Sequence, residues 1–155
     1  MPKATKTVLI TGAVVIAAVV AAYLYVFPKP AATTTGEVPC LKNGIPLTQH
    51  LHPLLHIFVG TVEESIPANI GLSPTCERAV HTHSDDVASG TIHVESQDSH
   101  RYTLGNFFAV WGKPIERDGY DLSVTVDGAP FAGDPSTIEL TDGQKIVFTY
   151  AIPRR

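Results

Sequence analysis

The longest mainly apolar stretch of the chain covers residues 7–27, where no charged side chain occurs. As a helix rising about 1.5 Å per residue, this stretch would span the roughly 30 Å hydrocarbon core of a bilayer. A cleaved signal peptide is the alternative, but its apolar region usually covers only about 7–15 residues. The aromatic residues Tyr23, Tyr25 and Phe27 near the end of the stretch are typical of a membrane interface. The pattern therefore predicts a single uncleaved transmembrane helix.

The charges that flank this span predict its orientation. Lys3 and Lys6 precede the span without a nearby acidic residue, whereas only Lys29 follows it closely. By the positive-inside rule, residues 1–6 are cytoplasmic and the rest of the chain lies on the outer face of the membrane. Residues 28–39 are rich in Pro, Thr and Ala without apolar periodicity, so they predict an extended linker.

Residues 40–155 contain short runs in which apolar and polar positions alternate, the pattern of half-buried strands. The predicted strands are residues 52–59, 62–66, 91–95, 121–126, 137–140 and 145–150. The turn residues at 141–144, Thr-Asp-Gly-Gln, predict a hairpin between the last two strands. This part of the chain has about 115 residues, enough for one hydrophobic core.

One segment, residues 103–112, has the period of a helix instead. The apolar side chains that recur at helical spacing are Leu104, Phe107, Phe108 and Trp111. Thr103 is a suitable N-cap, and Gly112 occupies the place of a C-terminal glycine. Taken with the strands, the pattern predicts an α+β domain, mostly antiparallel β with one short helix. A β-grasp-like sheet crossed by the helix, preceded by a single N-terminal transmembrane helix, is the specific expectation.

Charge and cysteine content narrow the class of protein. The net charge is −4 and no basic run occurs, which argues against nucleic acid as a partner. Cys40 and Cys76 both fall in the predicted outer domain, where an oxidising compartment favours a disulfide closing a loop of about 36 residues. The alternative is that Cys76, which precedes His81 by five positions, supplies a thiolate to a metal.

Histidines carry the candidate chemistry, since six of the seven lie between residues 50 and 93. His81 and His83, two positions apart on a strand, share one face, and His93 follows after a loop in which Gly90 lets the chain reverse. Imidazole is the commonest metal ligand, so these three residues predict a site for copper or zinc.

Other residues are candidates to complete this metal site. A second cluster consists of His50, His52 and His56, of which His52 is the first choice as a fourth ligand. Glu95, on the same face as His93, is a candidate ligand, orienting partner or general base, and Asp85 is a further carboxylate near the cluster. His100 stands apart and is expected to be a surface residue.

Two known histidine motifs match only in part. Residues 81–86 resemble the H-x-H-x-D-H run of metallo-β-lactamase-type hydrolases, but Asp86 stands where the last histidine belongs, and the domain is short for that fold. Cupins also combine H-x-H with an acid and a later histidine, but their glycine-punctuated spacing is missing. No nucleophile-elbow or phosphate-loop glycine pattern occurs in the chain.

The order of motifs across residues 40–150 resembles an uncharacterised family of secreted or membrane-anchored histidine-rich domains of archaea and bacteria. The blocks that carry the resemblance are H-T-H at 81–83, I-H-V-E-S at 92–96, and T-L-G-N-F-F followed by W-G at 103–112. The chain departs from the family pattern by a longer insertion at 84–88 and by Leu54 where relatives often have a histidine. The resemblance implies one domain with one site and no particular reaction.

These observations predict a membrane-anchored, extracytoplasmic domain that binds copper or zinc through several histidines. One alternative is a zinc-hydroxide enzyme, such as a carbonic-anhydrase-like hydratase, in which three histidines lower the pKa of a bound water. Another is an accessory subunit of a larger membrane complex. Gly12 and the alanines at 13, 17, 18, 21 and 22 would provide that subunit's small-residue packing face.

Overall fold

The computed structural model describes residues 37–153. The predicted transmembrane helix at 7–27, the cytoplasmic residues 1–6 and most of the linker lie outside this range, so they stay predictions. None of the helices formed by residues 37–153 has the length and apolarity that a membrane crossing requires.

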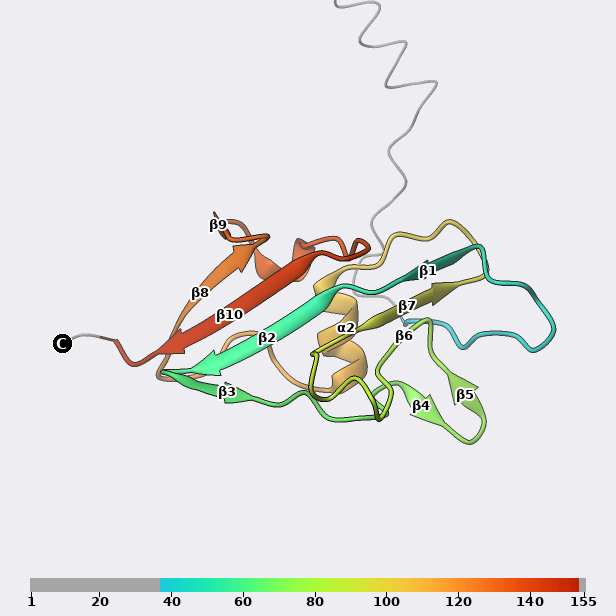
Figure 1. Cartoon of the computed structure of the whole chain (residues 1–155), viewed down its shortest axis with the longest axis horizontal. Coiled ribbons are helices and arrows are strands. Elements are labelled where there is room, and N and C mark those ends of the chain that lie inside the picture. Colours follow the sequence, from blue (N-terminus) through green and yellow to red (C-terminus); the bar gives the residue numbers. More distant parts are fainter. Residues whose placement is uncertain (1–36, 154–155) are drawn as a thin grey trace, which may run out of the picture. The chain divides into compact units, whose positions relative to one another are not determined.

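The described residues form ten strands, one α-helix and a single 3-10 turn (Figure 1). In chain order the elements are β1 (Gln49–Leu51), β2 (Leu54–Val59), β3 (Val62–Glu64), β4 (Leu72–Ser73), β5 (Cys76–Glu77), β6 (Val80–His81), β7 (His93–Ser96), α2 (Leu104–Trp111), β8 (Asp121–Val126), β9 (Ala129–Phe131), η1 (Pro135–Thr137) and β10 (Lys145–Ala151).

The strands form three sheets. The largest has the order β3-β2-β10-β8-β9, the second has the order β1-β7-β6, and β4 pairs with β5 alone. Every named pair is antiparallel except β2 with β10, which run parallel at the centre of the large sheet (Figure 1). The prediction of an α+β domain with mostly antiparallel strands and one helix is therefore confirmed for residues 37–153.

Helix α2 covers the segment that the sequence predicts. The backbone N–H of Thr103 donates to Asn106 Oδ1 at 2.9 Å, and Gly112 ends the helix with a left-handed φ of 72°. Leu104, Phe107 and Phe108 are buried, as the helical spacing requires. Phe108 stacks on Phe148 of β10 with ring centroids 5.7 Å apart, so the aromatic face of α2 packs on the large sheet.

The predicted strand at 137–140 and its hairpin to 145–150 are wrong. A 3-10 turn occupies Pro135–Thr137, and β10 pairs with β2 and β8 instead. Ile138 and Leu140 are buried, as their alternation suggests. They are held by the segment before α2, because Leu140 N donates to the Tyr102 carbonyl at 2.9 Å and Thr103 forms an isolated bridge to Glu139. Alternation identified the buried side chains but not the partner strand.

The disulfide predicted between Cys40 and Cys76 is present. Next to the disulfide, Cys40 and Arg78 form an isolated antiparallel β-bridge, and Leu41 N donates to the Glu77 carbonyl at 2.7 Å. Val38, in the segment predicted as linker, is already buried in the core. The disulfide therefore joins the start of the described chain to β5.

Candidate metal centre

One face of the three-stranded sheet carries most of the histidines. The middle strand, β7, pairs on one side with β6, where His81 lies opposite His93, and on the other with β1, where His50 lies opposite Glu95. Residues directly opposite one another in an antiparallel pair point to the same face. The intervening Val94 points to the other face and is fully buried. The register therefore collects side chains from three separated segments on one surface.

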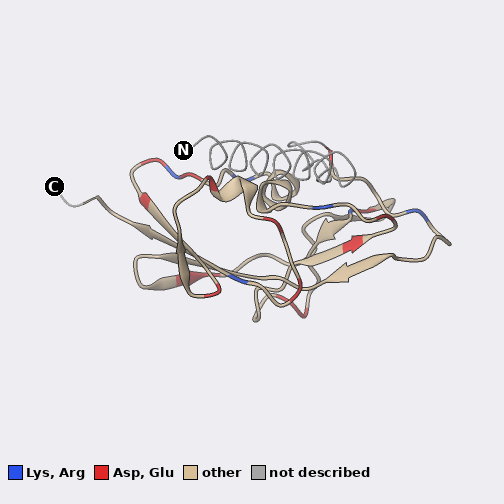
Figure 2. Cartoon of the chain, turned by 90° about the horizontal axis from the view of Figure 1, so that it is seen from above, with Lys and Arg blue, Asp and Glu red and all other residues tan. Residues whose placement is uncertain are grey.

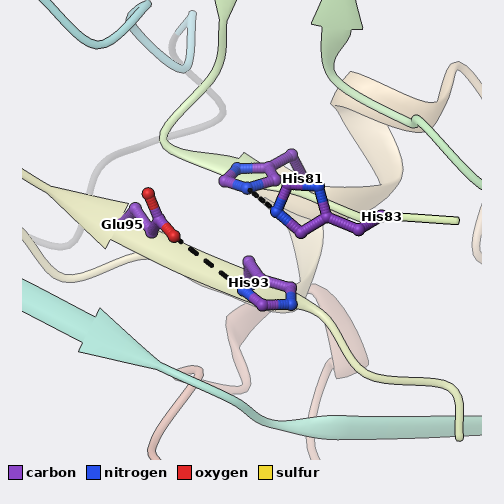
Figure 3. A group of neighbouring side chains, drawn as sticks. All are labelled: His81, His83, His93 and Glu95. Carbon is purple, nitrogen blue, oxygen red and sulfur yellow. Dashed lines mark hydrogen bonds and ion pairs between the residues drawn. The ribbon is translucent and has the colours of Figure 1, made fainter. Parts of the chain in front are cut away.

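Four of these side chains converge closely enough to share a metal ion. His81, His83, His93 and Glu95 each bring one ligand atom within 4.8 Å of the others (Figure 3). The Nε2 atoms of His81 and His83 are 3.1 Å apart, and His93 Nδ1 is 3.9 Å from Glu95 Oε1. Figure 3 shows the rings of His81, at the end of β6, and of His83 facing the side chains of His93 and Glu95 on β7.

His81 is held in the orientation of a ligand. Its side chain is fully buried, and Nδ1–H donates to the Arg78 carbonyl at 2.8 Å. That hydrogen bond leaves Nε2 with its lone pair directed toward the cluster. Burial lowers the pKa of His81 below its ordinary value of 6.5, so the imidazole is neutral at physiological pH.

His93 is oriented in the same manner by a carboxylate. Its Nε2 lies 3.1 Å from Asp86 Oδ2, and the same oxygen accepts the backbone N–H of His83 at 2.7 Å. The other nitrogen, His93 Nδ1, is buried without a hydrogen-bond partner among the described residues. Buried polar atoms are rarely left without a hydrogen bond, so this nitrogen has a lone pair available to a metal ion.

The sequence analysis predicted Asp85 as the carboxylate near the cluster. In the structure Asp85 is exposed to solvent, and Asp86 makes the contacts to His83 and His93 instead. A local signal for Asp86 exists in the sequence. A carboxylate three residues after His83 is at the right distance to cap that residue's backbone N–H.

Glu95 lies where a fourth ligand would bind, a role for which His52 was the first choice from the sequence. Its side chain is 13% exposed, and Oε1 lies 3.1 Å from His50 Nε2 and 3.9 Å from His93 Nδ1, the second distance being too long for a hydrogen bond. A carboxylate so enclosed, with histidines around it, is suited to bind a cation.

His52 belongs to a second group, with His50 and His93, whose ligand atoms also lie within 4.8 Å of one another. The side chains of His50 and His52 are 48% and 44% exposed, so this group opens to solvent. His93 is common to both groups.

The remaining two histidines lie outside both groups. His56, on β2, contacts Glu63 of β3 through Nδ1 at 2.6 Å. His100 is half-buried, with its ring 4.9 Å from that of Tyr102, so it is less exposed than expected of a surface residue.

Charge around the domain does not oppose a cation. Figure 2 shows acidic positions on strands and loops alike, with fewer basic positions, which are scattered.

Taken together, His81, His83, His93 and Glu95 offer three imidazole nitrogens and one carboxylate oxygen, a set of donors that can hold a metal ion.

No protein-family model, curated protein or solved structure matches this chain.

Proposed function

We propose that this domain binds one divalent transition-metal ion, zinc or copper(II), through His81 Nε2, His83 Nε2, His93 Nδ1 and a Glu95 oxygen. The observation that carries the proposal is the unpaired, buried Nδ1 of His93 beside the three other donors. Leaving such an atom without a partner costs roughly 1–3 kcal/mol, which coordination of an ion would remove.

The hydrogen bonds behind the ligands support the proposal. Metal-binding histidines usually donate their second ring N–H to a carbonyl or carboxylate, which fixes the tautomer and the ring orientation. His81 does so to the Arg78 carbonyl, and His93 is placed to do so to Asp86. Two rings therefore have their free nitrogens oriented before any ion arrives.

The donor set favours zinc or copper(II) among the common metals. Three imidazoles and one carboxylate suit both ions, whereas copper(I) prefers thiolate and thioether sulfur. Within residues 37–153 the only cysteines are joined in the disulfide, and the single methionine of the chain is Met1.

The number of donors favours binding over catalysis. Four protein donors complete a tetrahedral shell, whereas a catalytic zinc keeps one position for water or substrate. A binding module therefore fits better than the zinc-hydroxide hydratase that the sequence left as an alternative.

We further propose that the domain stands on the outer face of a membrane, anchored by residues 7–27. The disulfide between Cys40 and Cys76 supports an oxidising compartment, because cytosolic thiols are kept reduced. A role as an accessory subunit would depend on the same anchor.

We also propose that the fold is β-grasp-like. The parallel central pair β2 and β10, flanked by β3 and β8, supports this proposal.

Metal analysis of the full-length chain, purified without a histidine tag, tests the binding proposal. We expect one zinc or copper ion per chain that survives dialysis, whereas the double variant H81A/H83A should hold an ion so weakly that dialysis removes it. The matched control, H56A/H100A, also removes two histidines but should keep its ion. Unchanged metal content in H81A/H83A would refute the site.

A further inference from the structure

The histidines of the two groups form a continuous series from solvent to the interior. Ring centroids are 4.4 Å apart for His50 and His52, 4.8 Å for His52 and His93, and 4.6 Å for His93 and His83. The last pair, His83 and His81, is separated by 4.7 Å. Side-chain exposure falls along this series, from 48% at His50 to 15% at His93 and 0% at His81.

The exposed end is a metal-binding arrangement in its own right. His50, His52 and His93 bring ligand atoms within 4.8 Å of one another. We call His81, His83, His93 and Glu95 the inner site, and His50, His52 and His93 the outer group. His50 Nε2 also lies 3.1 Å from Glu95 Oε1, so the carboxylate of the inner site is within reach of the outer group too. These contacts follow from the pairing of β1 with β7, which sets His50 opposite Glu95.

His93 connects the two groups but has one nitrogen to offer. Its Nε2 is engaged by Asp86, which leaves the unpaired Nδ1 as the donor for either group. An imidazole lone pair binds one ion at a time. An ion held by His93 together with His50 and His52 therefore excludes an ion held by His93 together with the inner ligands.

We propose that His50 and His52, with His93, form an outer position through which the metal ion reaches the inner site. This inference rests on the proposed function. In the transfer, the bonds from the ion to His50 and His52 break as bonds to His81 and His83 form, while His93 stays bound. No electron is transferred, and the ion keeps its charge. The outer position captures divalent zinc or copper(II) from solvent, and the buried position retains it.

The proposal is tested by the rate and the stoichiometry of metal uptake. Copper(II), supplied as its glycine complex, is mixed rapidly with the metal-free full-length chain, and visible absorbance follows binding. For H50A/H52A we expect one ion per chain, as in the wild type, but uptake slower by about tenfold or more. The control H56A/H100A should take up copper at the wild-type rate.

Both outer side chains are about half exposed, so H50A/H52A is expected to fold like the wild type. The variant H50N/H52N, which keeps polar side chains at both positions, repeats the measurement, and far-UV circular dichroism checks the fold of each variant.

Two results would overturn the outer position as a route of uptake. One is a wild-type uptake rate in both outer-site variants. The other is two ions per wild-type chain with one lost in H50A/H52A, which would mean two independent sites. Failure of the proposed function looks different: the wild type would then bind no ion, or H81A/H83A would bind as the wild type does.

Discussion

At the scale of single residues, His93 is the point on which the centre depends. Its ring belongs to both groups of ligands, and Asp86 contacts one nitrogen while the other is buried without a hydrogen-bond partner among the described residues. A histidine that served only packing would have both nitrogens hydrogen-bonded or exposed to water. Glu95, two positions from His93 on the same strand, adds a carboxylate oxygen to the three imidazole nitrogens.

The charge of Glu95 is expected to matter more than its shape. The variant E95Q keeps the size of the side chain but removes the anionic ligand, so the dissociation constant for zinc should rise by about tenfold or more. Competition with a chromophoric chelator measures this constant. The control E63Q removes a glutamate that contacts His56 instead, and it should bind zinc as the wild type does. Equal affinities for E95Q and the wild type would exclude Glu95 as a ligand.

At the scale of elements, the position of β7 between β1 and β6 creates the site. Both pairings must keep their register, because a slip of one residue would turn His93 and Glu95 to the core and bring Val94 to the ligand face. The loop before β7 helps to set that register. Gly90, at its end, has a φ of +68°, and its carbonyl accepts the N–H of Leu55 at 2.9 Å.

Substitution of Gly90 should therefore destabilise the domain. A Cβ at this position would lie 2.3 Å from the Leu55 carbonyl oxygen, in addition to the cost of a positive φ. We expect G90A to lower the free energy of unfolding by about 1–3 kcal/mol. The matched control is G143A, with a φ of +66° and nothing within 4 Å of the added Cβ. Urea denaturation compares the two, and equal midpoints would contradict the steric argument.

At the scale of the whole domain, contacts distant in sequence hold the sheets and the segments around them together. The disulfide joins the beginning of the described chain to β5. On the large sheet, Arg117 Nη1 donates to Glu64 Oε2 at 2.6 Å, which ties the segment after α2 to β3. Arg117 also lies over the ring of Tyr150, 4.2 Å from its centroid, so this ion pair borders the central strand β10.

Removal of the disulfide should weaken the domain as a whole. For a loop of 36 residues, the chain-entropy estimate is about 3–4 kcal/mol. We expect C40S/C76S to lose free energy of unfolding on this scale in urea denaturation. Reducing agent should destabilise the wild type and leave the double variant unchanged. A wild type that is indifferent to reduction would contradict the prediction.

Acid should destabilise the domain through Glu64. Its hydrogen bond to Arg117 holds the pKa of Glu64 below the ordinary value of 4.5. The unfolded state therefore binds the proton more tightly, and the stabilisation is fully present above pH 4.5 and is lost as the pH falls through the lower, folded pKa. The variant E64Q should be less stable at neutral pH and lose less stability on acidification.

Urea midpoints measured across the acid range test this prediction, with E116Q, which changes an exposed glutamate directly before Arg117, as the control. Parallel pH profiles for E64Q and the wild type would contradict it.

Much of this protein follows from patterns within single segments. The spacing of Leu104, Phe107 and Phe108, with Thr103 and Gly112 at the ends, predicts α2 because helical geometry repeats over a few residues. Alternation identifies β2, β8 and β10, and two cysteines in one domain predict the disulfide. The prediction that His81 and His83 share one strand is only half right, because β6 ends at His81 and His83 lies two residues beyond it. Their Nε2 atoms still approach to 3.1 Å, so the chain beyond the strand, and not strand alternation, places His83.

Tertiary structure alone decided which segments meet. Residues 137–140 alternate like a strand, yet they lie beside the segment that precedes α2, because strand period is the same whichever partner is chosen. For the same reason the sequence favoured His52 as fourth ligand, whereas the structure groups Glu95 with the inner histidines. The ligand set depends on the register of β1, β7 and β6, which is fixed by the burial of residues such as Val80 and Val94 on the opposite face. Residue type and local period determined the candidates, and long-range packing selected among them.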